Sequence, residues 1–279
     1  MVVPALSEAQ DSVYARHLIA DLASPQMYGR GCAHRGDSIA ADYIRGEFCR
    51  WGVAPLAEDY FQPFVFEKGR STPPVIVPGY RSQNVCGMVR GRSDSVVVFA
   101  AHYDHLGMSG DTLFPGAHDN ASGTAAVLDL ARQFAADTPY YTIVFMLFGG
   151  EEAGLVGSRF AASHPLFDYS LIRLFCNIDM FCGGDEGLMV VNANDSATRG
   201  FVARMESADS AGGLPFTVKH RDNAPNSDHY WFSAFCPAIF IYTLGGPYGG
   251  YHSPEDTCEG CGLAHYEAFL KRIKTVALP

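Results

Sequence analysis

The chain has 279 residues, of which 48% are hydrophobic and 18% are charged, as expected for a globular protein with ample material for a core. Its formal net charge of -10 and its lack of a basic run argue against a nucleic-acid partner, because a phosphate-binding surface needs clustered Lys and Arg. No stretch reaches the roughly eighteen apolar residues that span a bilayer, and the first ten residues lack the charged and long apolar regions of a signal peptide.

The first third of the chain predicts two helices followed by short strands. Apolar residues at helical spacing predict a helix over residues 11–24. A second helix is expected from about Ser38 to Trp51, with Ser38 as its N-cap and Gly52 as its stop. The Gly-rich polar segment between them predicts a loop. Residues 53–80 are rich in Pro and aromatic residues and too apolar to be disordered, so they predict edge strands and turns.

From Asn84 onward, strands alternate with helices. Strands are predicted at residues 84–89, 95–101, 141–148, 171–180, 188–192 and 238–243, and helices at 121–136, 155–163, 196–208 and 263–276. The run 95–101 (SVVVFAA) is apolar throughout, as a strand covered on both faces should be. This alternation predicts a three-layer α/β/α sandwich around a mixed, mostly parallel sheet. No repeat or linker is visible, so residues 1–279 are expected to form a single domain.

Side chains of the kind that bind metals fall where the predicted strands end. In open α/β sheets, ligands bind outside the carboxyl ends of the strands, so these side chains are expected to meet in one crevice. They are His102 and Asp104 after the strand 95–101, Asp119 in a loop before a helix, Glu151 and Glu152 after the strand 141–148, Asp179 at the end of the strand 171–180, and His252 in a Gly-rich loop.

The spacing of these residues favours metal-assisted hydrolysis. His102 and Asp104 are two apart and share a face of an extended segment, so one can bind a metal while Asp104 orients it. Glu151 and Glu152 are adjacent and cannot point the same way, so one can bind a metal while the other takes a proton from water. Singly, such residues are more often helix caps or solvated charges, and only their conjunction at one sheet edge predicts a site.

The types of ligand in this set suit zinc. Imidazoles with carboxylates and no thiolate are typical of catalytic zinc, and cobalt or manganese would also fit. The set exceeds the three protein ligands of a mononuclear catalytic zinc. It therefore predicts two ions that share a bridging carboxylate and a water.

The eight cysteines show no regular disulfide framework. Cys176, Cys182 and Cys236 lie in apolar segments and are expected to be small buried hydrophobic residues. Cys258 and Cys261 form a CxxC pair in a Gly-rich loop. A local disulfide, two free thiols and a separate metal site all remain open for this pair.

The motifs AHYDHLG, GAHDNASG, GGEE, NID and YHSPEDT, in this order, resemble those of the family-twenty-eight metallopeptidases, which are co-catalytic di-zinc aminopeptidases. The segments DLASPQMYGRG and AADYIRGEF are also similar to the opening of that family, so the resemblance covers nearly the whole chain. It implies that Asp119 bridges two zinc ions, that His102 and Asp179 complete one zinc site, and that Glu152 and His252 complete the other.

The resemblance also implies roles for residues around the ligands. Glu151 would be the general base, and Asp104 would be the carboxylate partner of His102. Tyr251 matches a tyrosine that helps to stabilise the oxyanion in some members, and Tyr230 is a competitor for that role.

Two further segments concern the surroundings of the site. The pair Asp228-His229 matches a family feature that lies close to the metals, where it could contact ligands or substrate. In place of the two Asp residues that commonly precede the Asn, this chain has His118-Asp119. His118 is not expected to be a primary ligand.

The leading hypothesis is an aminopeptidase that acts on peptides with a free N-terminus. The alternative is a glutaminyl cyclase with one zinc on Asp119, Glu152 and His252, although cyclases tend to have Ser-Ala-Val where this chain has Asn-Ala-Ser-Gly after Asp119. A third hypothesis is a binding domain that has kept the fold without the chemistry. Family habit implies a secreted or periplasmic location, and the oligomeric state cannot be predicted.

Overall fold

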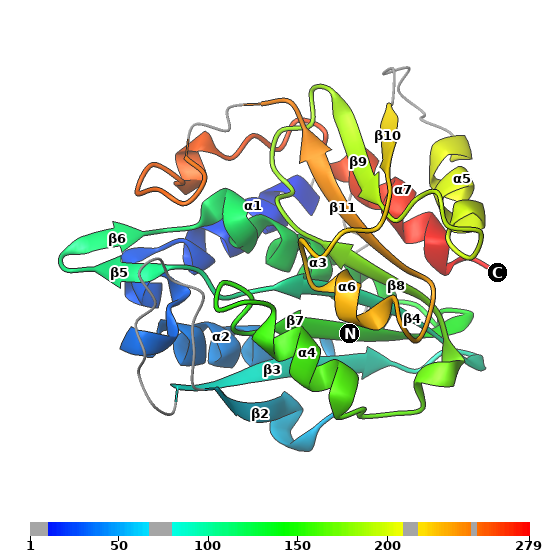
Figure 1. Ribbon diagram of the computed structural model, residues 1–279, viewed down its shortest axis with the longest axis horizontal. Helices are drawn as coiled ribbons and strands as arrows, with labels where there is room; N and C mark the ends of the chain where they lie inside the picture. Colours follow the sequence, from blue (N-terminus) through cyan, green and yellow to red (C-terminus); the bar gives the residue numbers. More distant parts are fainter. Residues whose placement is uncertain (1–10, 67–79, 209–216, 247–249) are drawn as a thin grey trace, which may run out of the picture.

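The computed structural model describes residues 11–66, 80–208, 217–246 and 250–279. Within these residues, nine strands form one sheet, in the order β1-β3-β7-β4-β8-β11-β9-β10, with β2 paired to β3 (Figure 1). The strands of this sheet are β1 (Ala54–Pro55), β2 (Phe61–Phe66), β3 (Tyr80–Val89), β4 (Ser93–His102), β7 (Tyr141–Phe148), β8 (Ile172–Ile178), β9 (Gly187–Val191), β10 (Val218–Arg221) and β11 (Ala238–Leu244).

The centre of the sheet is parallel. Strands β7, β4, β8 and β11 pair in parallel, whereas β1, β2 and β3 at one margin and the β9–β11 pair toward the other are antiparallel. The predicted mixed sheet is confirmed, with most of its parallel pairing at the centre. Because parallel strands end at the same edge, the carboxyl ends of these four strands lie side by side.

Helices cover both faces of the sheet and form the outer layers of the predicted sandwich, which is confirmed. One face packs against α1 (Asp11–Leu22), α2 (Gly36–Trp51), α3 (Ser122–Ala135), α5 (Arg199–Ser207) and α7 (Tyr266–Lys274), and the other against α4 (Val156–Ser163) and α6 (His229–Phe232) (Figure 1). Because both faces of the sheet are covered, strand β4 is apolar on both faces. Val97 and Phe99 enter the core of the first face, and Val96 and Val98 enter that of the second.

Several local predictions were wrong, and each error has a physical reason. Ser38 is not the N-cap of α2, which begins at Gly36 after Arg35, whose backbone is left-handed. Gly52 does end the helix, at φ +73°. The hairpin of β5 (Gly107–Ser109) and β6 (Thr112–Phe114), together with β10 and α6, was not predicted, because elements of three or four residues are too short to show a period. The strands expected within residues 67–79 lie outside the described residues.

The cysteine predictions need correction. Cys182 forms a disulfide with Cys261, whereas it was expected to be a buried hydrophobic residue, and Cys258 keeps a free thiol rather than pairing with Cys261. The partners are 79 residues apart in sequence with Cα atoms 5.2 Å apart, so only the folded chain brings them together. Among the described helices, none is long and apolar enough to cross a membrane.

Candidate metal centre

The predicted ligands gather at the carboxyl edge of the parallel strands. His102 is the last residue of β4, and its neighbour across the ladder is Phe148, three residues before Glu151. Asp179 follows β8 directly, and its backbone N–H donates to Ile241 of β11 at 3.1 Å. The strand register thus places ligands from separate motifs at one edge of the sheet.

The first group of donor atoms consists of His102, Asp119 and Asp179, all of which are buried. His102 Nε2 lies 3.2 Å from Asp179 Oδ1 and 3.3 Å from Asp119 Oδ1. One imidazole nitrogen therefore faces two carboxylate oxygens. A single ring N–H can donate well to one of them, whereas a cation between the three groups would satisfy both.

The second group uses the other oxygen of Asp119. His252 Nε2 lies 3.0 Å from Asp119 Oδ2 and 3.3 Å from Glu152 Oε1. A further imidazole, His105, faces the same oxygens, with its Nδ1 2.9 Å from Glu152 Oε1 and 3.9 Å from Asp119 Oδ2. Asp119 thus presents one oxygen to each group, as a bridging carboxylate must.

The residues of both groups fit a zinc ion. Donor atoms about 2.0–2.1 Å from a tetrahedral zinc lie roughly 3.3–3.4 Å from one another, and the histidine–carboxylate contacts of the five predicted ligands span 3.0–3.3 Å. Glu152 Oε1 is buried and has no hydrogen-bond partner within the part of the chain that the structure describes, which is costly for a carboxylate unless a cation is bound. Nitrogen and carboxylate donors are those that zinc prefers.

The histidines and carboxylates of the site stabilise one another in their charged forms. Burial alone would raise the pKa of Asp119, but contacts with His102 and His252 hold it well below its ordinary value. The contacts with Asp119 and Glu152 raise the pKa of His252 to about 10. A bound metal would replace the protons on the histidines of the site. Metal binding is therefore expected to release protons and to weaken at low pH.

The loop that carries Asp119 is fixed to the loop that carries Asp179. Residues Ala117–Ala121 form a turn in which the backbone angles of Asp119 and Asn120 are not helical, and the Asp119–Asn120 peptide bond is cis. The Asn120 side-chain amide donates to Ile178 O at 3.1 Å and accepts from Met180 N at 3.1 Å, so it is hydrogen-bonded to the backbone on both sides of Asp179. A Cβ at Gly123 would lie 2.4 Å from Ile178 O, so the close approach of α3 requires glycine there.

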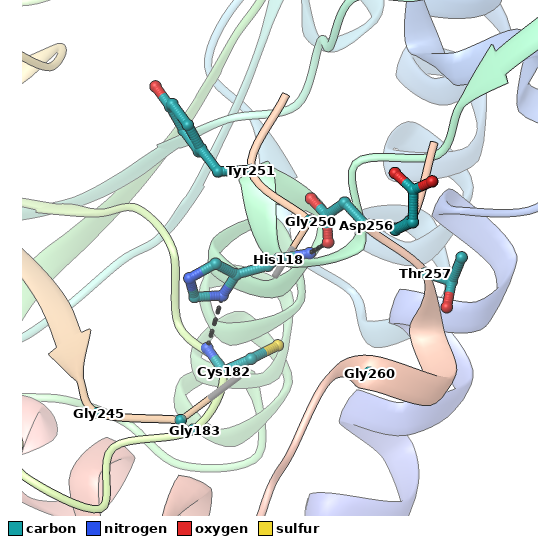
Figure 2. Close-up of a pocket in the computed structure, with 11 residues that line it drawn as sticks. His118, Cys182, Gly183, Gly245, Gly250, Tyr251, Asp256, Thr257 and Gly260 are labelled. Carbon is teal, nitrogen blue, oxygen red and sulfur yellow. Dashed lines mark hydrogen bonds between the residues drawn. The ribbon is translucent and has the colours of Figure 1, made fainter. Parts of the chain in front are cut away.

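Asp256 joins the loop that carries His252 to the loop that carries Asp119. Its carboxylate accepts from the backbone N–H of His118 at 2.7 Å and of Asp119 at 3.0 Å, and its carbonyl accepts from Ala117 N at 3.1 Å. His118 lies in the wall of a small cavity beside the site, where its Nδ1 accepts from Cys182 N at 3.3 Å (Figure 2).

Arg30 is fully buried beneath the site and binds backbone carbonyls. Its guanidinium donates to the carbonyl oxygens of Leu22, Tyr103, Pro115 and Gly116 at 2.6–2.8 Å. Burial lowers its pKa to about 10, while nearby carboxylates oppose that shift, so the side chain stays charged at neutral pH. It connects the end of α1, the segment after β4 and the segment before Asp119.

Asp104 orients the two glutamates through their backbone. Its Oδ1 accepts from Glu151 N at 3.0 Å and its Oδ2 from Glu152 N at 3.3 Å. Its contact with His102 is looser, because His102 Nδ1 lies 3.7 Å from Asp104 Oδ1 and 3.2 Å from the Asp104 carbonyl oxygen. The carboxylate predicted to hold His102 therefore also sets the turn that separates Glu151 from Glu152.

Comparison with known proteins is consistent with this geometry. The sequence profile of the M28 peptidase family matches residues 84–277. The chain belongs to peptidase family M28. The resemblance seen in its motifs is thereby confirmed.

Among M28 relatives, the chain is 30% identical to aminopeptidase YwaD of Bacillus subtilis over 190 residues, which cover 64% of this chain and 40% of YwaD. It is 33% identical to an aminopeptidase of Pseudomonas aeruginosa over 108 residues, which cover 38% of this chain and 19% of that protein. The chain spans about half the length, or less, of the curated relatives it matches first.

Solved structures share the M28 fold. The LapA aminopeptidase of Legionella pneumophila aligns with a TM-score of 0.72 at 20% identity, covering 95% of this chain and 68% of LapA. A glutaminyl cyclase of Tannerella forsythia aligns with a TM-score of 0.74 at 20% identity, covering 98% of this chain and 99% of that chain. At this level of identity, the likeness concerns the fold.

In this M28 chain, Tyr251 lies beside His252, the predicted ligand that follows it. Its ring stacks on His252 with centroids 3.9 Å apart, and its side chain is largely exposed. Tyr230 packs edge-on against Trp231. The stacking places Tyr251 beside the second donor group, and its role with the oxyanion remains a prediction.

The NSDHYWF segment reaches the site through Ser227. Ser227 Oγ donates to Asp179 Oδ2 at 2.9 Å, whereas His229 contacts Asn223 and the ring of Phe240. Asp228 is fully buried, and burial raises its pKa to about 7.

Several residues of the site were not predicted as functional, although each lies in or beside a quoted motif. His105 is in AHYDHLG, Asn120 in GAHDNASG, Asp256 in YHSPEDT, Arg30 in the opening segment and Ser227 beside Asp228. The motifs were therefore the signal by which these residues could have been found. The sequence does not show the direction in which each side chain points.

Proposed function

We propose that this chain is the catalytic part of a two-zinc aminopeptidase that removes the N-terminal residue of a peptide. The observation that carries the proposal is the pair of donor groups that share Asp119, each with an imidazole and a second carboxylate. The aminopeptidase names of relatives and the M28 profile support it.

Bound metal ions would polarise the scissile carbonyl and lower the pKa of a water shared between them. In this proposal Glu151, whose backbone N–H donates to Asp104, would take a proton from the attacking water and pass it to the leaving amine. Burial raises the pKa of Glu151 well above its ordinary value, and the carboxylates of Asp228 and Asp179 add to this rise against the opposing effect of His102. A bound cation would oppose this rise, because it stabilises the ionised form that accepts a proton.

The proposal of a substrate with a free amine rests on the aminopeptidase names of relatives. Asp119, Glu152 and Asp179 bring three carboxylates to the site, and the charge of two zinc ions would exceed theirs. The loaded site would therefore accept a neutral amine at the substrate N-terminus rather than attract an ammonium group.

A glutaminyl cyclase with one zinc is the second candidate, and the similarity in fold to such enzymes keeps it open. It would need only Asp119, Glu152 and His252. The spacing of His102 and Asp179 around the other oxygen of Asp119 favours the peptidase, because without a second zinc His102 Nε2 faces two carboxylate oxygens and can donate well to only one of them.

The test is turnover of a panel of aminoacyl anilides and of a peptide with N-terminal glutamine, with zinc content measured on the same sample. Anilide hydrolysis with two zinc ions per chain is expected. Pyroglutamate formation with one zinc per chain would replace the peptidase by the cyclase. Absence of any bound divalent metal would exclude both.

We further propose that the protein works in an oxidising compartment, secreted or periplasmic. The Cys182–Cys261 disulfide supports this location, because reducing cytosol disfavours structural disulfides. Mass spectrometry of alkylated protein from its native source would test it, and a free thiol at Cys182 would contradict it.

A further inference from the structure

His105 is a buried imidazole that the five predicted ligands leave out. Its side chain is 0% exposed, and neither ring nitrogen has a hydrogen-bond partner among the described residues. A buried imidazole without partners is expensive, so its position calls for an explanation. The groups nearest to its Nδ1 are the carboxylate oxygens of Glu152 at 2.9 Å and Asp119 at 3.9 Å.

The same two oxygens face His252. His252 Nε2 is 3.0 Å from Asp119 Oδ2 and 3.3 Å from Glu152 Oε1, and the rings of His105 and His252 meet edge-on with centroids 5.7 Å apart. Two imidazoles therefore converge on one pair of carboxylate oxygens. The 2.9 Å contact of His105 lacks hydrogen-bond geometry, since neither Nδ1 nor Glu152 Oε1 is satisfied by it. A cation shared by these donors would satisfy both atoms.

The two imidazoles differ in how firmly they are held. His105 follows β4, its N–H faces Arg30 O at 3.4 Å, and its ring packs over Gly116, where a Cβ would lie 2.5 Å from the ring. His252 lies on a surface loop with φ +54°, and its side chain is 36% exposed. The buried imidazole is preorganised by its surroundings, whereas the exposed one is accessible to solvent and substrate.

We propose that His105 is a ligand of the second metal position, together with Asp119 and Glu152, and that it retains the ion while His252 is the exchangeable ligand. The inference rests on the proposed metal-dependent function. Four protein donors would close a tetrahedral zinc, and a catalytic zinc keeps one position open. The accessible His252 is the ligand that can yield this position without loss of the ion.

The experiment compares zinc binding by the wild-type protein and by His105→Ala and His252→Ala, using competition with a chromophoric chelator. His220→Ala is the matched control, since His220 is an exposed histidine paired with Glu206. Removing His105 is expected to weaken the second zinc by about 100-fold or more, and removing His252 by less than about 10-fold. The control should match the wild type.

Equal zinc affinity in His105→Ala and the wild type would overturn the proposal, as would a greater loss in His252→Ala than in His105→Ala. His105→Gln fills most of the space of the ring. Its unfolding transition in the presence of chelator shows whether this variant is folded, and its zinc affinity replaces that of His105→Ala if the alanine variant does not fold. If the wild type binds only one zinc, the peptidase proposal fails. Asp119 and Glu152 then hold that single ion, and its affinity in the same variants still tests His105.

Discussion

Glu151 and Glu152 are neighbours in sequence with opposite surroundings. Burial alone would raise the pKa of Glu152, but contacts with His105 and His252 hold it below its ordinary value. For Glu151, burial with nearby carboxylates outweighs the opposing effect of His102 and raises its pKa well above that value. A carboxylate that stays ionised is suited to hold a metal, and one whose pKa is raised is suited to exchange a proton.

Replacing Glu151 with Gln is therefore expected to remove turnover without removing metal. The amide cannot accept the proton, and loss of a general base lowers kcat by roughly 10²–10⁴-fold. The measurement is kcat on an aminoacyl anilide with zinc content on the same sample, and Glu152→Gln, which should lose zinc, is the comparison. Activity within several-fold of the wild type would remove Glu151 from the role of base.

Asp228 predicts a pH dependence of stability. Its pKa of about 7 in the folded protein exceeds the ordinary 3.8 because of burial, so the folded chain keeps this proton up to about pH 7 while the unfolded chain releases it near pH 4. Between these pH values the folded state binds more protons than the unfolded state, so the contribution of Asp228 to the free energy of unfolding falls as pH rises. An Asn at this position does not titrate, so its contribution should not fall with pH.

Asp228→Asn is thus expected to gain stability over the wild type between pH 4 and pH 7, by up to about 4 kcal/mol for three pKa units. The measurement is urea unfolding at several pH values in the presence of chelator, so that no metal shifts the titration. Asp222→Asn, at an exposed neighbouring position, should show no such trend. A constant difference between Asp228→Asn and the wild type at all pH values would contradict the assignment.

Sequence could predict residue types at the site far better than side-chain directions. The candidate residues were expected from their places at strand ends and in loops, and the resemblance to the family selected five of them as ligands. The structure brings all five together. His105 was not singled out, because three residues after His102 the chain has already left the strand and no period gives its direction. Its packing over Gly116 depends on a loop from another part of the chain.

At the scale of elements, the site depends on loops that are joined to each other. Asp256 accepts hydrogen bonds from the backbone of His118 and Asp119 through its carboxylate, so the loop of the exposed predicted ligand His252 is joined to the loop of Asp119. Asn120 extends this connection to the segment around Asp179. The positions of ligands far apart in sequence are thus coupled through backbone hydrogen bonds.

Asp256→Asn should loosen the connection between these loops. An amide presents one acceptor where the carboxylate presents two, so one backbone N–H loses its partner, at a cost of about 1–3 kcal/mol in the free energy of unfolding. Zinc affinity is expected to fall about 10–100-fold, as for other groups that position ligands. Chelator competition and urea unfolding would measure both effects.

The adjacent Glu255 provides the control for this prediction. Its side chain is exposed and bonds only to Ser253 among the described residues, so Glu255→Gln should leave zinc affinity unchanged. Equal zinc affinities in the two variants would show that Asp256 does not position the ligands.

Long buried elements were predictable, and short or special ones were not. Strand β7 and helix α3 match their predicted ranges to within a residue or two, because apolar runs and helical periods carry through their whole length. The start of α2 was displaced, since Arg35 in a left-handed conformation precedes it instead of a capping serine. Strand β10 has no apolar period, because three of its four residues are exposed, and only pairing with β9 defines it.

At the scale of the whole molecule, segments distant in sequence close around the metal centre. The Cys182–Cys261 disulfide connects the segment after β8 to the one before α7, and Arg16 Nη1 donates to the carbonyls of Cys258 and Cys261 at 2.9 and 2.7 Å. The fold class could be predicted from the alternation of strands and helices in the sequence. The contacts between these distant segments could not be predicted, because contacts across 79 or more residues leave no local pattern in the sequence.

Removing the disulfide should therefore destabilise the whole chain rather than one loop. A cross-link between residues 79 apart restricts the unfolded ensemble, and its loss typically costs about 2–4 kcal/mol. Urea unfolding of the Cys182→Ala, Cys261→Ala double variant should show that loss, and reducing agent should bring the wild type to the same stability. Cys258→Ser is the control and should unfold like the wild type, because its thiol is free. If Cys258→Ser loses as much as the double variant, Cys261 pairs with Cys258 instead, and the closure depends on Arg16 and packing alone.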